Sequence, residues 1–301
     1  MSWITLALLS AAILALSNML DKTIVHRYVA TPLTLPLMVG IAHTLLGLVI
    51  LAAIGVPESA TLSANLFALA SGALIGLGGL IWIVVMYRQE ISRVIPVTQT
   101  SPIFAAILAV VFLNESMSAW QWAAVVATVS GAIAISIKIG ESYRDIFIQR
   151  SFFILILAAI IAATANIIGK VALNDLPILY THGLRSIGLG TLFLVVGIRR
   201  APLANLSTLI RTRSPALLVF GVNEFVVANG ALLLLLWALS EGPASRVLAL
   251  AGTRAMFVVL FSTSLALIWK GALGEDTARR AIVIKVGAVI AIVLGIAGVS
   301  V

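Results

Sequence analysis

The residues best suited to chemistry are charged and amide side chains placed inside long apolar runs. Glu224, with Asn223 beside it and Asn229 one turn later, lies within an apolar run from about Ala216 to Leu239. By sequence it is the one carboxylate well inside such a run. A charge at the centre of a membrane-spanning helix costs roughly 2.5–3.5 kcal/mol on insertion scales, so it normally faces a cavity or a partner. The stretch predicts either an ion pair between helices or a residue of a transport pathway.

Two arginines, Arg185 and Arg254, also fall inside apolar runs. Counted at about 1.5 Å per residue from the predicted non-cytoplasmic end, each lies roughly 10–12 Å deep and Glu224 roughly 22 Å. That gap is long for a direct ion pair, although Asn229 and water can bridge it. One reading is a buried Arg–Glu–Arg network that fixes three helices. The reading we favour is a cavity that presents the arginines to a carboxylate or phosphate, and Glu224 to an amine or a proton.

His43 is expected near the middle of the membrane, roughly 15 Å into its helix. A histidine at that depth either hydrogen-bonds to a neighbouring helix or titrates inside a cavity. Both roles are compatible with the sequence. Glu224 is the first candidate for proton coupling and His43 the second.

Four further polar or aromatic positions complete the candidate site. Asn18 and Asn166 occupy matching places in two related segments, which fits a shared packing role as well as a shared site. Gln99 lies close to two prolines in one apolar run, and prolines in such runs free backbone carbonyls and permit bending. Trp82 belongs to the set, although lipid or core contact is the commoner place for such a residue.

The composition requires a membrane to position these side chains. The chain has 301 residues, of which 61% are hydrophobic and 10% charged, and its mean hydropathy is +1.17. Soluble domains carry about 25% charged residues, so the class is a polytopic membrane protein. The net charge of +8 resides in short loops, which argues for membrane orientation and against a nucleic-acid partner.

The predicted fold is all-α, with ten transmembrane helices, since ten segments have the roughly 20 apolar residues that a spanning helix needs. The segments are Trp3–Leu20, Leu33–Ile54, Leu66–Tyr87, Val94–Leu113, Ala119–Ile137, Phe152–Ile168, Ile178–Ile198, Ala216–Leu239, Val247–Trp269 and Ala281–Val301. A basic leader is missing before the first one, which predicts an uncleaved span. The expected location is the cell (inner) membrane.

Lysine and arginine are distributed unevenly between the loops. Loops after odd-numbered helices hold fifteen of them, whereas loops after even-numbered helices and the termini hold two. Because basic loops stay in the cytoplasm, this bias predicts that both termini are non-cytoplasmic.

The two halves repeat in sequence order. Asn18 and Lys22 match Asn166 and Lys170, Thr100 falls on Thr253, and Leu113-Asn114-Glu115 matches Leu273-Gly274-Glu275. Five helices per half is an odd number, so the second half must be inverted in the membrane. We therefore predict two inverted repeats, residues 1–140 and 151–301, with the substrate held at their interface. Lys22 and Lys170 are expected to extend to the membrane surface.

Two five-helix halves, each with a Leu-x-Glu between its fourth and fifth helices, resemble the drug/metabolite transporter superfamily and its EamA-type branch. Gly131-Ala132-Ile133 and Gly295-Ile296-Ala297 follow the two Leu-x-Glu motifs and carry the same resemblance. It covers nearly the whole chain. The resemblance implies a secondary transporter with a central cavity, commonly an exporter of amino acids, other metabolites or drugs.

No hydrolase or kinase motif is present, and three histidines without cysteine make no recognisable metal site. We expect no enzyme activity, cofactor or metal. Gly72 and Gly76 form a small-residue face for close helix packing.

The expected function is export of amino acids or similar small metabolites by alternating access, with proton coupling as an option. The alternatives are an exchanger of carboxylate or phosphate metabolites, and a non-transporting scaffold or membrane enzyme. The partners are a small-molecule substrate and the bilayer, and a homodimer is compatible with the sequence.

Overall fold

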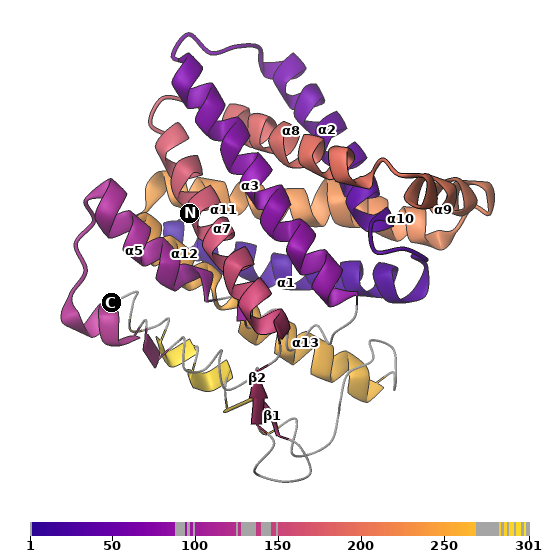
Figure 1. Cartoon of the computed structure of the whole chain (residues 1–301). Helices are drawn as coiled ribbons and strands as arrows, with labels where there is room; N and C mark the ends of the chain where they lie inside the picture. The colour runs from indigo at the N-terminus through magenta and orange to yellow at the C-terminus, as the bar shows by residue number, and fades with distance from the viewer. Residues whose placement is uncertain are drawn as a thin grey trace.

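In the computed structural model, the apolar runs form helices (Figure 1). Short polar side chains cap the start of two of them. The side chain of Ser2 accepts a hydrogen bond from the first turn of α1 (Trp3–Arg27). Thr61 does the same for α3 (Leu62–Met86). Such caps satisfy backbone N–H groups that a helix leaves free at its start. Between them, α2 (Thr34–Ile54) ends at Gly55, which has a φ of 74°.

The structure describes residues 2–87, 100–124 and 150–268. Outside these ranges it describes residues 94, 97, 98, 126, 127, 137–139, 146–148, 283, 286, 287, 289–291, 293–295 and 298.

The remaining described elements continue the helical pattern. In chain order they are α5 (Ser101–Leu113), the antiparallel strand pair β1 (Ile137–Ile139) and β2 (Ile146–Ile148), α7 (Arg150–Ala172), α8 (Ile178–Gly197), α9 (Arg200–Arg211), α10 (Pro215–Val222), the π-helix η1 (Asn223–Ala228), α11 (Asn229–Glu241), α12 (Ala244–Ala251) and α13 (Arg254–Ile268). The strand pair joins the two halves of the chain.

Among the described residues, seven helices are long and apolar enough to cross a membrane. They are Trp3–Arg27, Thr34–Ile54, Leu62–Met86, Ser151–Ala172, Ile178–Gly197, Pro215–Glu241 and Ala244–Ser262. Their positions agree with seven of the ten predicted spans. The fourth predicted span is described as the shorter α5, and the fifth and tenth lie mostly outside the described residues. A multi-pass helical membrane protein is therefore established.

The first span is longer than predicted, because α1 continues to Arg27 and not to Leu20. Asp21 and Lys22 are consequently inside the helix, and both side chains are buried. The apolar pattern resumes after them at Ile24, so one polar pair was mistaken for the end of the span.

Three other details differ from the predicted pattern of helices. Ile137 lies in β1 and does not end a helix. The basic connection after α8 contains the additional helix α9. The ninth predicted span is interrupted, since α12 ends at Ala251 and α13 begins at Arg254.

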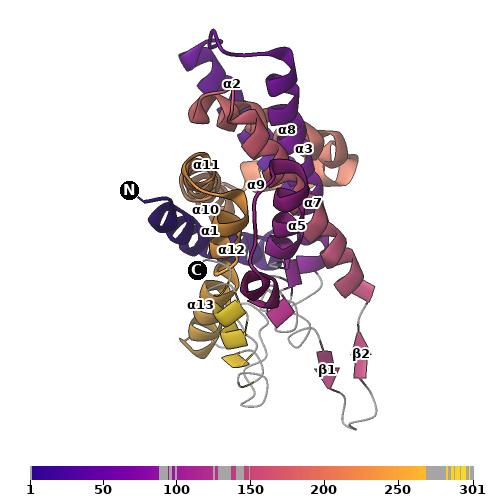
Figure 2. The same ribbon diagram turned by 90° about the vertical axis from the view of Figure 1, so that its left-hand side faces the viewer.

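The described helices form two groups, which Figure 2 shows side by side. In one group α8 packs between α2 and α3, and α7 packs along α3. In the other group α11, α12 and α13 pack around α1. The first helix of the first half, α1, therefore lies with α11, which belongs to the third apolar run of the second half. The first helix of the second half, α7, lies with α3, the third apolar run of the first half.

Glycines bring the helices of the first group close together. A Cβ atom on Gly72 of α3 would lie 2.0 Å from the Arg185 backbone oxygen of α8, and one on Gly76 would lie 3.2 Å from that of Leu189. The first contact is available only to a residue without a side chain, and the second is tighter than most contacts of a Cβ atom. The predicted packing face at Gly72 and Gly76 is therefore confirmed.

The contact between α2 and α8 also depends on glycine. A Cβ on Gly40 would lie 3.1 Å from the Gly190 oxygen, and a Cβ on Gly47 would lie 2.6 Å from the Gly183 oxygen. The two helices therefore approach each other through glycines with the same spacing, Gly40 and Gly47 on α2 and Gly183 and Gly190 on α8.

Lys22 and Lys170, which we expect to extend to the membrane surface, each contact the end of a helix. The Nζ of Lys22 donates to the backbone oxygen of Met86, at the end of α3, over 2.7 Å. The Nζ of Lys170 donates to the oxygens of Leu239 and Gly242 at the end of α11. Backbone carbonyls at helix ends carry partial negative charge and lack helical partners, so each lysine closes the end of a helix of its own half.

Candidate functional site

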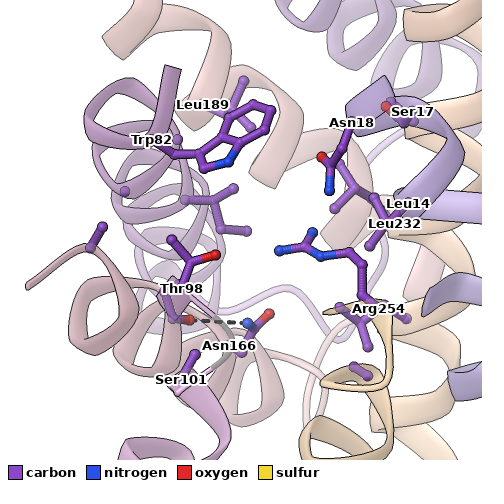
Figure 3. Close-up of a pocket in the computed structure, with 18 of the residues that line it drawn as sticks. Leu14, Ser17, Asn18, Trp82, Thr98, Ser101, Asn166, Leu189, Leu232 and Arg254 are labelled. Carbon is purple, nitrogen blue, oxygen red and sulfur yellow. Dashed lines mark hydrogen bonds between the residues drawn. The ribbon is translucent and has the colours of Figure 1, made fainter. Parts of the chain in front are cut away.

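A central cavity of about 250 Å³ lies where the two helix groups meet. Its wall contains five predicted site residues, namely Asn18, Trp82, Asn166, Glu224 and Arg254. Figure 3 shows Arg254 reaching toward the middle of the cavity, with Asn18 nearby and Trp82 on the facing wall. At about 30 Å³ per water molecule, the volume would hold roughly eight waters.

Arg254 projects into this cavity because the chain breaks just before it. Gly252 and Thr253 interrupt the helix between α12 and α13, and Arg254 is the first residue of α13. Among the described residues no hydrogen bond or ion pair reaches its guanidinium. A cation at the positive N-terminal end of a helix is unfavourable without an anion. The position is electrostatically suited to a carboxylate or phosphate group.

Three buried N–H donors that line the cavity lack hydrogen-bond partners in the described part of the chain. They are Asn18 Nδ2, Trp82 Nε1 and Arg254 Nε. Leaving a buried donor unpaired costs about 1–3 kcal/mol. All three would be satisfied by a ligand, or by water, that offers oxygen acceptors.

Glu224 is held by an amide and a histidine and not by an arginine. Its Oε2 lies 3.2 Å from His43 Nε2, and its Oε1 accepts a 3.3 Å hydrogen bond from Asn223 Nδ2. The same Nδ2 donates to Asp21 Oδ1 over 2.8 Å. The alternative of a buried Arg–Glu–Arg network is therefore wrong for the described residues. His43 makes a contact between helices, one of the two roles considered for it.

The backbone around Glu224 is a π-helix, from Asn223 to Ala228. Such segments insert one extra residue into a helix and occur frequently at functional sites. Asn229 follows directly, and its Nδ2 donates to the backbone oxygen of Glu224 over 2.5 Å. Asn223 and Asn229 thus position Glu224 without lining the cavity themselves.

Arg185 lies outside the central cavity and contacts it through Asn166. Its NH2 group donates to Asn166 Oδ1 over 3.1 Å, and Asn166 Nδ2 donates to the Ala162 oxygen. The guanidinium borders a second cavity of about 20 Å³, which His43 and His182 also line. Arg254 therefore lines the central cavity, and Arg185 lines the small one.

Asp21 was missed by the sequence reading. It is 8% exposed, lines the central cavity and shares Asn223 with Glu224. The resumption of apolar residues at Ile24 and Val25 was the signal that could have placed it inside the first span.

Gln99 lies outside the described residues. Its neighbours Thr98, Ser101 and Pro102 line the cavity, as do Gly252 and Arg254. The fourth and ninth predicted spans therefore both border the cavity at matching positions. The described residues contain no group of three metal-ligating side chains.

Comparison with solved structures gives the fold. A crystal structure of a protein matches 98% of this chain and 96% of its own, with a TM-score of 0.62 and 15% identity. At that identity the likeness concerns the fold alone. None of the curated proteins compared matches the chain.

Comparison with family models gives the family. Residues 1–137 match the model of the EamA-like transporter family, over the first predicted repeat. The match confirms, over these residues, the predicted resemblance to the EamA-like transporter family of the drug/metabolite transporter superfamily.

Proposed function

We propose that the chain is a secondary transporter that exports amino acids or similar small carboxylate-bearing metabolites through the central cavity. The observation that carries this proposal is Arg254, a cation without a described partner at the start of a broken helix and inside the cavity. In transporters built from repeats, the N-termini of discontinuous helices commonly point at anionic substrate groups.

The other charges of the cavity favour a substrate with an amine as well as a carboxylate. Asp21 and Glu224 both line the wall, so the cavity contains more carboxylates than arginines among its described residues. A substrate with two or more negative charges would be repelled by this pair. A zwitterion satisfies both kinds of charge.

An exchanger of anionic metabolites is the second candidate. It is favoured by the three unpartnered donors, Asn18 Nδ2, Trp82 Nε1 and Arg254 Nε, which offer hydrogen bonds to oxygens and none to an amine. Phosphorylated metabolites would use such donors most fully.

The mechanism we propose is alternating access between two inverted five-helix repeats, residues 1–140 and 151–301. Three pairs of contacts support the repeat. Lys22 and Lys170 close corresponding helix ends, and Gly40 with Gly190 repeats Gly47 with Gly183. Thr100 and Thr253 donate to the oxygens three residues before them.

The termini are proposed to be non-cytoplasmic and the membrane to be the inner membrane. The amphipathic helix α9 supports this orientation, because Arg199, Arg200, Arg211 and Arg213 gather at its two ends. Glu224 remains the first candidate for proton coupling. A homodimer is compatible with this arrangement.

The test is transport by the purified protein in liposomes. Preloaded liposomes are given a labelled panel of neutral amino acids, dicarboxylates and sugar phosphates, and counterflow is measured. We expect saturable counterflow of an amino acid, with half-saturation raised roughly 10–150-fold in Arg254→Ala, which corresponds to loss of a charged hydrogen bond.

Arg254→Lys should recover part of that affinity. Arg246→Ala is the matched control, because Arg246 lies on α12 and does not line the cavity. Saturable counterflow of sugar phosphates alone would favour the exchanger. Unchanged affinity in Arg254→Ala would remove the carboxylate site.

A further inference from the structure

His43 stands between two cavities that lie next to each other. On one side its Nε2 contacts Glu224, which lines the central cavity. On the other side the imidazole lines the small cavity of about 20 Å³. Ile75, Leu189 and Leu232 line both cavities, so the two spaces are neighbours.

The small cavity is built to take a water molecule. A water needs about 10–15 Å³ and two to four polar partners. His182, Arg185 and Ser186 provide polar walls together with His43. Two buried atoms of this set, His43 Nδ1 and Arg185 Nε, have no hydrogen-bond partner among the described residues. Their side chains are 2% and 7% exposed, respectively.

The opposite end of the contact is a pair of carboxylates. Asn223 Nδ2 donates to Asp21 Oδ1 and to Glu224 Oε1, which brings the two acids to one amide. Both are buried, and both line the central cavity. Two negative charges so close in a medium of low dielectric repel each other, and one added proton relieves the repulsion.

We propose that His43 carries protons between the small cavity and the Asp21–Glu224 pair. The inference rests on the proposed transporter function and adds its coupling route. A hydronium ion that reaches the small cavity gives a proton to Nδ1 and leaves water there, and Nε2 gives its own proton to Glu224 Oε2. The ring passes from one neutral tautomer through imidazolium to the other, and Glu224 becomes a neutral acid. The reverse transfers, or a rotation of the ring, restore the first tautomer.

The charges that face His43 from neighbouring elements allow this passage. Glu224 on η1 contacts Nε2 and Asp21 on α1 lies one amide further on, whereas Arg185 on α8 lines the small cavity. His182, also on α8, provides a second imidazole on the cavity wall. The carboxylates therefore lie on the Nε2 side of the ring, and the arginine borders the small cavity.

The other half of the chain indicates that packing alone does not require these groups. In the proposed repeat, the match of Leu239 with Met86 makes Ser71 correspond to Glu224, to within the one residue that η1 inserts. The glycine contacts of α2 and α8 likewise make Ser186 the residue that corresponds to His43 in the proposed repeat. The proposed repeat thus fills the same two positions with serines in one half and with titratable side chains in the other.

The experiment separates proton movement from substrate movement in the same liposomes. A pH-sensitive dye inside reports protons that accompany substrate, and counterflow at equal pH reports substrate exchange alone. We expect His43→Gln to lower substrate-driven proton movement at least about tenfold, since a proton-transfer group contributes roughly 10²–10⁴-fold. Counterflow should fall by a smaller factor.

His26→Ser is the matched control, because His26 is an exposed histidine on α1. Asp21→Asn is the second variant, and it should lower proton movement from the opposite end of the route. Wild-type counterflow without proton movement would overturn the route and leave the transporter standing, whereas missing counterflow would overturn the transporter itself. Proton movement retained in a folded His43→Gln or Asp21→Asn protein would also overturn the route.

Discussion

Thr100 and Thr253 make the same hydrogen bond in the two halves of the chain. Thr100 Oγ1 donates to the Val97 oxygen over 2.8 Å, and Thr253 Oγ1 donates to the Leu250 oxygen over 2.7 Å. Each threonine directly precedes a helix that begins at the cavity wall. A side chain that bonds back to a carbonyl competes with the helix ladder, and the same bond precedes the start of α5 and of α13.

If the halves correspond, Lys22 and Lys170 should contribute similarly to stability. Lys22→Met and Lys170→Met each remove a charged donor from carbonyls at a helix end. We expect each to lower the free energy of unfolding by roughly 1.5–3 kcal/mol. Thermal unfolding in detergent measures this, with Arg27→Met as the control because Arg27 is exposed. A loss in only one variant would argue against the correspondence.

Asn18 and Asn166 should differ in spite of their matching positions. Asn166 accepts a hydrogen bond from buried Arg185, so Asn166→Ala leaves a charge less satisfied and should cost roughly 1.5–3 kcal/mol of stability. Asn18 Nδ2 has no partner among the described residues. Asn18→Ala should keep stability within about 0.5 kcal/mol and weaken substrate affinity roughly 2–10-fold. Unfolding and counterflow, measured together, would show a reversed or equal pattern if this assignment is wrong.

Gly72 should not tolerate even one added methyl group. Its Cβ would lie 2.0 Å from a backbone oxygen, which cannot move independently of α8. Gly72→Ala should therefore destabilise the fold by roughly 1–3 kcal/mol or more. At Gly221 a Cβ meets nothing within 4 Å, so Gly221→Ala should be neutral or slightly stabilising. Equal unfolding temperatures for the two variants would contradict the close α3–α8 contact.

The predicted orientation can be tested with single thiols, because the chain contains no cysteine. Ser207→Cys on α9 should react with a membrane-impermeant maleimide only after the cytoplasmic side is opened. Ser59→Cys, in the connection between α2 and α3, should react in intact cells. Both serines are exposed in the structure, so access depends on the side of the membrane. Reaction of Ser207→Cys in intact cells would reverse the proposed topology.

The sequence alone determined the class of the protein and the course of most spans, because membrane insertion depends on local hydropathy. Residue type also predicted Glu224, Arg254 and Trp82 as candidates, and all three line the cavity, although lipid or core contact is commoner for a residue such as Trp82. The spacing of Gly72 and Gly76 predicted the glycine face on α3. These features depend on residue type within one helix.

The partners of the charged residues were decided only by the tertiary structure. Glu224 contacts His43 and Asn223. Asp21 lies in the site because α1 continues past it. Lys22 donates a hydrogen bond to the end of α3. Each of these contacts joins segments far apart in the chain, and its formation depends on how two helices cross. Hydropathy places a residue in the membrane, but the rotation of each helix about its own axis is set by packing against its neighbours.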